Sequence, residues 1–238
     1  MAMSNADWKP ARHGPLVSVT EGLWSVSAEL DLLPIGRRMT VVRASSGELL
    51  VHSAVACDEL TMQGIDALGP VGTIIVPSAS HKIDAPRYAA RYPGARVLTP
   101  QTARRLVEKA LPVHGSYGDL SGDPRLRVEL LDGVTGEGVF IHTDSAGDVS
   151  LVFNDALMNL PDRLPGFKGW ITKLMGSTGG PKVTPITRRF IVKDPLAYQA
   201  HLRRLAELPR LRRIIVSHGD LIENDAPHVL RQVADTLG

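Results

Sequence analysis

Three short apolar segments of this chain are each followed closely by residues that can bind a metal ion. Runs of this length bounded by polar residues are typical of buried strands, and the loops that follow such strands meet at one edge of a sheet. Imidazole and carboxylate groups are ligands that Zn and Fe use in proteins. We therefore expect a sheet protein with a candidate metal site at one edge. The segments and their following residues are 73–76 with His81 and Asp84, 149–153 with Asp155, and 214–216 with His218.

The composition limits the class of protein. A chain of 238 residues with 43% hydrophobic residues can bury an ordinary core. The single cysteine excludes an internal disulfide and favours a reducing compartment, so a cytoplasmic location is expected. Residues 1–12 lack the apolar centre of a signal peptide, and no segment reaches the ~18 apolar residues of a membrane span. A net charge of +2 is too small to indicate a nucleic-acid partner.

The first half of the chain begins with strand signals and continues with alternating strands and helices. Two strand segments flank Ser45-Ser46-Gly47, a good hairpin turn, so an antiparallel meander is expected at the start. The helix expected over 58–68 has Leu60, Ile65 and Leu68 as its apolar side. The expected strands are 23–26, 39–42, 48–52, 73–76 and 97–98, and the other expected helices are 84–92 and 100–110.

The second half repeats this organisation without a repeat in sequence identity. A second antiparallel block is expected, followed by a helix that Pro209 ends, a strand and a last helix. Two strand-rich blocks, each closed by helix and strand, predict two similar halves packed sheet on sheet with helices outside. The expected strands are 126–131, 138–142, 149–153 and 213–216; the helices start at Asp194 and Asp225, with Tyr198, Leu202 and Leu205 on one inner face and Leu230, Val233 and Leu237 on the other.

The order of these elements and candidate ligands resembles the metallo-β-lactamase fold, and within it a degenerate family of unknown function. The stretches that carry the resemblance are "MTVVRASSGELLVHS", "LGPVGTIIVPSASHKIDAPRYAARYPGARVLTP", "VSLVFNDALMN" and "RRIIVSHGDLIE", which together run from Met39 to Glu223. The resemblance implies a four-layer αββα sandwich of the α/β class. It also implies that residues 1–238 form a single domain, with a basic insertion at about 160–193.

The chain departs from the family pattern in the first ligand loop. An active member reads His-x-His-x-Asp-His there, whereas this loop reads Ser78-Ala79-Ser80-His81-Lys82-Ile83-Asp84. His81 then matches the second histidine and Asp84 the last. The next family histidine has no clear match, because the turn before Gly138 offers only Asp132 and Glu137, and His142 lies within a strand pattern. Asp155 fits the bridging carboxylate and His218 the last histidine, so one metal is expected rather than two.

By this resemblance, His81, Asp84, Asp155 and His218 would hold one Zn or Fe ion, or none if the site is a remnant. The implied function is a metal-dependent hydrolase of a small anionic ester, thioester or lactone, with a metal-activated water as nucleophile. The alternative is a non-catalytic descendant that binds a ligand or partner. Purely structural roles also remain open. Asp84 is well placed to cap a helix, and the residues at the strand ends can form turns. Lys82 either orients an anionic substrate or is solvated.

The remaining histidines are interpreted as structural or solvated. His52 ends a strand pattern and is expected to be partly buried. The others stand in terminal, loop or helical contexts with no partner nearby in the sequence, and we expect them to be solvated. These are His13, His114, His201 and His228.

A basic segment follows the Asp155 loop. Between Arg163 and Lys193 there are seven basic residues and no Asp or Glu, and large apolar residues alternate with lysines between glycines. We expect a mobile cover in which Lys168, Trp170 and Lys173 bind an anionic substrate. A dimer contact, a weak foothold on an anionic membrane and an ordinary packed loop are the alternatives, and nucleic-acid binding ranks last.

Overall fold

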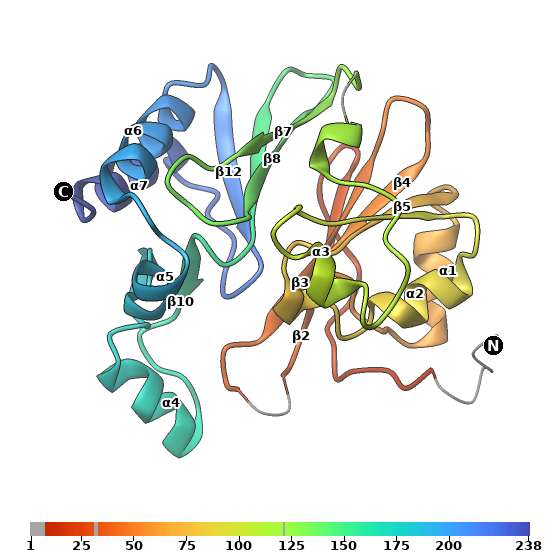
Figure 1. Cartoon of the computed structure of the whole chain (residues 1–238), viewed down its shortest axis with the longest axis horizontal. Coiled ribbons are helices and arrows are strands. Elements are labelled where there is room, and N and C mark those ends of the chain that lie inside the picture. The colour runs from red at the N-terminus through yellow and green to blue at the C-terminus, as the bar shows by residue number, and fades with distance from the viewer. Residues whose placement is uncertain (1–7, 31–32, 121) are drawn as a thin grey trace. The chain divides into compact units, whose positions relative to one another are not determined.

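The computed structural model describes residues 8–30, 33–120 and 122–238, so part of the N-terminal stretch considered above lies outside the described residues. The chain divides into two compact units. The described residues of unit 1 lie within the ranges Met1–Glu29 and Arg37–Arg127, and those of unit 2 lie within Leu30–Gly36 and Val128–Gly238. Each unit has its own sheet and helices (Figure 1). Each unit also has its own hydrophobic core.

The described part of unit 1 contains a sheet of six strands that lie side by side in chain order. The strands from β1 to β4 pair antiparallel, and β4, β5 and β6 pair parallel. The expected meander and hairpin are confirmed, with Gly47 adopting a φ of +89° in the turn. The strands are β1 (Val17–Thr20), β2 (Leu23–Ala28), β3 (Arg37–Arg43), β4 (Leu49–His52), β5 (Val71–Ile75) and β6 (Arg96–Leu98).

The helices of unit 1 follow the expected order with two corrections. Asp58 caps the first helix by accepting the N–H of Thr61 at 2.8 Å. Leu60 is 80% exposed, because Met62, three residues before Ile65, shares the buried face instead. The helix expected over 100–110 is reduced to one turn. The elements are α1 (Glu59–Asp66), η2 (Ala79–His81), α2 (Ala85–Arg91), α3 (Arg104–Val107) and η3 (Tyr117–Leu120).

Unit 2 is built around a sheet in the order β12-β9-β8-β7. Strands β8 and β9 pair antiparallel as expected, and β12 pairs parallel to β9. The parallel pairing brings the ends of β9 and β12 together, so the loops that follow these two strands leave the sheet at the same edge. The strands are β7 (Leu126–Leu130), β8 (Gly138–Thr143), β9 (Val149–Phe153) and β12 (Leu211–Val216).

Two helices supply most of the helical side of the unit 2 core. These are α6 (Pro195–Ala206) and α7 (Ala226–Asp235), and all six inward residues expected from the sequence are buried. The basic segment forms defined elements. These are α4 (Gly166–Leu174), β11 (Gly180–Lys182), which pairs with β10 (Met158–Leu160), and α5 (Pro185–Phe190). None of the helices in the described part of the chain has the length and apolar character that crossing a membrane requires.

Candidate metal-binding residues

Asp155 lies in the loop that follows β9, and this loop is held by buried polar contacts. One oxygen of the Glu137 carboxylate accepts the backbone N–H groups of Asn154 and Ala156, both at 2.9 Å. The Thr187 hydroxyl donates to the carbonyl of Asp155 at 3.0 Å. The Asp155 side chain is 14% exposed. The loop therefore presents this carboxylate from a backbone that is fixed on both sides.

Glu137 is a buried carboxyl close to Asp155. Burial raises its pKa above the ordinary value, and the negative charge of Asp155 raises it further, while the backbone N–H groups act in the opposite direction. In the sequence, Glu137 and Asp132 are the carboxylates of the turn where the family histidine has no clear match. The structure uses Glu137 as the acceptor that braces the Asp155 loop.

His218 follows β12 and lies beside Asp155. Its Nδ1 is 2.7 Å from the carbonyl oxygen of Gly36, and its Nε2 is 3.2 Å from Oδ1 of Asp155. The next residue, Gly219, has a φ of +99° and lies directly against the carbonyl of Asn159. The backbone N–H of Asn159 donates to the carbonyl of His218 at 3.1 Å. Both the ring and the backbone of His218 are therefore held in place.

The Gly36 contact determines where the ring proton of His218 lies. A carbonyl oxygen only accepts, so Nδ1 carries a proton and Nε2 of the neutral ring carries a lone pair. This lone pair faces a carboxylate oxygen, and two acceptors 3.2 Å apart repel each other unless a proton or a cation lies between them. The pair fits either an imidazolium–carboxylate ion pair or a metal ion bound by both groups, and the donor set suits Zn or Fe.

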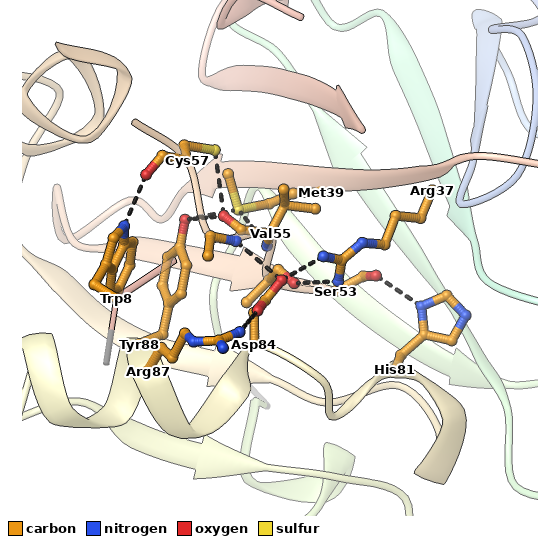
Figure 2. Close-up of polar contacts among 12 residues, drawn as sticks. Trp8, Arg37, Met39, Ser53, Val55, Cys57, His81, Asp84, Arg87 and Tyr88 are labelled. Carbon is orange, nitrogen blue, oxygen red and sulfur yellow. Dashed lines mark hydrogen bonds and ion pairs between the residues drawn. The ribbon is translucent and has the colours of Figure 1, made fainter. Parts of the chain in front are cut away.

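His81 of unit 1 is positioned by a serine. It ends η2, it is buried, and its Nδ1 is 2.7 Å from the Oγ atom of Ser53 (Figure 2). Ser53 directly follows β4 and has a φ of +58°, a left-handed conformation that is uncommon for a residue with a side chain. Strained residues of this kind are concentrated at functional sites. A ligating histidine is commonly oriented by a hydrogen bond to its other ring nitrogen, which is the role that Ser53 could have here.

Asp84 is buried in an ion-pair cluster of unit 1. Its two oxygens bind Arg37 and Arg87, and the oxygen that binds Arg37 also accepts the N–H of Ala56 at 3.1 Å (Figure 2). It stands at the N-cap position of α2, but the expected side-chain cap is wrong. The reason is the backbone, since Asp84 has helical angles and a capping residue requires extended ones. Its role as a metal ligand stays a prediction.

Solved structures share the fold over 93% to 98% of this chain. A metallo-β-lactamase from Erythrobacter litoralis, solved with β-mercaptoethanol in the active site, matches with a TM-score of 0.60 and 15% identity over 93% of this chain and 96% of that one. The mono-zinc form of FIM-1 from Pseudomonas aeruginosa matches with a TM-score of 0.61 and 13% identity over 95% and 97%. DIM-1, exposed to ceftazidime, matches with a TM-score of 0.62 and 12% identity over 98% and 100%.

The chain has the metallo-β-lactamase fold. The fold class and the resemblance inferred from the sequence are confirmed. Residues 21–103 match the model of a domain of unknown function (DUF4336), which agrees with a degenerate branch of this fold. No curated protein matches the chain in sequence. The metallo-β-lactamase fold does not by itself assign an activity, because activity depends on the residues of the site.

The four residues expected to contact substrate differ in their exposure and in their polar contacts. Lys82 follows His81, and its Nζ donates to the carbonyl of Ala79 at 2.8 Å. On α4, Lys168 and Trp170 are exposed, and Lys173 forms an ion pair of 2.9 Å with Asp162. The substrate-binding roles of all four residues stay predictions.

Two of the histidines expected to be solvated are buried instead. The His13 side chain is 7% exposed and accepts the N–H of Asp58, and His201 is buried and accepts the N–H of Asp132. Burial lowers the pKa of His201, and the charge of Arg204 adds to this effect. These partners lie 45 and 69 residues away in the chain, so local context could not indicate them. His228 and His114 are exposed as expected, and His52 is buried.

Proposed function

We propose that this protein binds one metal ion, Zn or Fe, through His81, Asp155 and His218, and that it hydrolyses a small anionic ester, thioester or lactone. The observation that carries the proposal is the pairing of Nε2 of His218 with Oδ1 of Asp155 at 3.2 Å, with Nδ1 bound to a carbonyl. This arrangement directs an imidazole lone pair and a carboxylate oxygen at the same point. The resemblance to the metallo-β-lactamase fold supplies His81 as the proposed third ligand, and three protein ligands leave a position for water or substrate in catalytic zinc sites.

Each proposed ligand has a neighbour that maintains its direction. Gly36 holds the His218 ring, Glu137 holds the loop of Asp155, and Ser53 contacts the His81 ring. Hydrogen bonds of this kind commonly change metal affinity by about 10- to 100-fold. When bound, the metal would supply a Lewis acid that activates water and polarises the substrate carbonyl.

Two observations on this chain favour one metal over two, and one solved structure of the same fold gives a precedent. Both oxygens of Asp84 are engaged by Arg37 and Arg87, so we propose a structural role for this carboxylate. The loop from Ser78 to Asp84 has one histidine, so it lacks the imidazoles for a second metal. The structure of FIM-1, which has the same fold, was solved in a mono-zinc form.

Lys82, adjacent to His81, is the proposed contact for the negative charge of the substrate.

The first experiment measures metal binding. Protein purified without added metal is analysed for its metal content and titrated with Zn²⁺ in a calorimeter. We expect one equivalent at most, with affinity reduced by at least about tenfold in His81→Ala, Asp155→Asn and His218→Ala. The matched control is His228→Ala, because this histidine is exposed on α7. Two tightly held equivalents, or unchanged affinity in any of the three variants, would contradict the proposed ligand set.

The second experiment measures hydrolysis. Ester, thioester and lactone substrates with and without a carboxylate are tested against the metal-loaded protein, the chelated protein and Asp155→Asn. We expect turnover that requires the metal, favours anionic substrates and is reduced in Lys82→Ala. Metal binding without turnover of any substrate class would leave the metal site standing and reject the hydrolase.

A non-catalytic role is the second candidate, and the Asp84 cluster favours it. Two arginines neutralise a carboxylate in the loop that supplies several metal ligands in active members of the fold. A descendant that lost the metal would retain His218 and Asp155 as an ion pair. If titration with Zn²⁺ and Fe²⁺ gives no binding, this candidate replaces the hydrolase.

A further inference from the structure

Helix α4 of unit 2 exposes large apolar side chains to solvent. Phe167 is 73% exposed, Trp170 is 58% exposed and Leu174 is 72% exposed. The rings of Phe167 and Trp170 stack with their centroids 5.8 Å apart, so the two aromatic side chains form one continuous surface. Figure 1 shows α4 beyond α5 and β10, away from α6 and α7 in the same unit.

The helix is oriented with its apolar side outward. Residues three, four and seven positions apart share one helix face, which places Phe167, Trp170 and Leu174 together. Gly169 lies on the opposite side and is buried, and a Cβ atom there would collide with the carbonyl of Leu164. The chain at Leu164 therefore packs against α4 at Gly169, where there is no side chain, and the apolar side of the helix stays exposed.

The charges around this face are positive. Successive residues of a helix are rotated by about 100°, so Lys173 lies beside Trp170, whereas Lys168 lies farther round the helix, toward its polar side. The whole segment from Arg163 to Lys193 has seven basic residues and no acidic ones, and the nearby Asp162 pairs with Lys173. A helix with an aromatic apolar face and lysines on its remaining surface has the properties of one that lies in a lipid interface, with its lysine stems extended toward the headgroups.

We propose that α4 docks on an anionic lipid bilayer, with Phe167, Trp170 and Leu174 at the boundary between headgroups and acyl chains and with Lys168 at the anionic headgroups. Charge favours this occupant over a second copy of the chain. A symmetric dimer through α4 would bring two basic segments with no acidic residue against each other. A helix of nine residues is too short to span the bilayer, so the contact is peripheral and reversible.

The test uses the full chain and two kinds of vesicle, pure phosphatidylcholine and equal parts of phosphatidylcholine and phosphatidylglycerol. Co-sedimentation should show binding to the anionic vesicles only, weakened by added salt. The double variant Phe167→Ser and Trp170→Ser should bind at least about tenfold more weakly, because less apolar area is buried. Lys168→Glu should also weaken binding, and Trp170→Leu should retain most of it.

The matched control is Leu60→Ser, because Leu60 is exposed on α1 and lies outside the basic segment. Thermal melting of each variant verifies that it is folded. Three results would overturn the proposal: no binding to anionic vesicles, equal binding to neutral ones, or unchanged binding in the double variant. Self-association without vesicles that the double variant abolishes would also overturn it, since α4 would then be a dimer contact. The experiment involves no metal, so it is independent of the proposed hydrolase.

Discussion

His218 and Asp155 face each other through Nε2 and Oδ1 at 3.2 Å, and the opposite nitrogen of the His218 ring is bound to the backbone carbonyl of Gly36. The direction of the candidate ligand atom is therefore set by main-chain groups on segments distant in the sequence. Changes that move this backbone should affect metal binding even when all three proposed ligands are present.

Gly219→Ala tests this dependence. Gly219 has a φ of +99°, and an added Cβ would collide with the carbonyl of Asn159, so the substitution must displace the backbone next to His218. We expect a loss of about 1 to 3 kcal/mol in the free energy of unfolding and a Zn²⁺ affinity at least about tenfold lower. Urea denaturation and calorimetry measure the two effects. Gly94→Ala is the control, because a Cβ at Gly94 meets nothing within 4 Å, and it should change neither quantity.

Asp84→Asn distinguishes a structural carboxylate from a metal ligand. The change leaves Arg37 buried without its full counter-charge, and breaking a buried ion pair costs about 3 to 5 kcal/mol of stability. Asp235→Asn, which affects an exposed pair with Arg203, should cost less than about 1 kcal/mol. If Asp84→Asn instead removes metal while the protein keeps its stability, Asp84 is the ligand that the sequence pattern indicated.

Glu137 should make the metal-free protein less stable as the pH rises. The pKa of Glu137 in the folded protein is raised above the ordinary value of 4.5. Above pH 4.5 the folded state therefore keeps a proton that the unfolded state has lost. The free energy of unfolding consequently decreases as the pH rises above 4.5. Glu137→Gln should remove this part of the pH dependence. Glu137→Ala should cost about 1 to 3 kcal/mol at all pH values, because two buried N–H groups lose their acceptor. Urea denaturation of each variant across the pH range is the measurement, and an unchanged slope in Glu137→Gln would refute the assignment.

The single cysteine should be inert in the folded protein. Burial raises the pKa of the Cys57 thiol to about 12, with smaller contributions from Asp58 and Asp84. We expect iodoacetamide to react with Cys57 only in unfolded or locally opened molecules, because the thiolate is the reactive form and burial disfavours it in the folded protein. Between the ordinary value of 9.0 and the raised value, the same shift should reduce stability as the pH increases. Fast labelling under native conditions at neutral pH would contradict this.

Much of the fold could be predicted because its signals are local. Apolar runs marked strands such as β5, β9 and β12, a Ser-Ser-Gly turn marked the β3–β4 hairpin, and Asp58 marked the start of α1. The period of apolar residues also indicated the buried faces of α6 and α7. The assignment of Leu60 was wrong because a period of 3.6 residues allows more than one face in a short helix, and burial of Met62 determined which face was used.

The candidate ligands could be found in the sequence because histidine and aspartate follow strand segments, but their roles depend on partners far away in the chain. Arg37 lies 47 residues from Asp84, and Gly36 lies 182 residues from His218. No local pattern indicates such partners, since hydrogen bonds and ion pairs form wherever the folded chain brings complementary groups together. The sequence by itself thus determined the order of strands, helices and candidate ligands. Only the tertiary structure decided that Asp84 is neutralised by arginines, that Glu137 braces the Asp155 loop, and that α4 turns its apolar face to solvent.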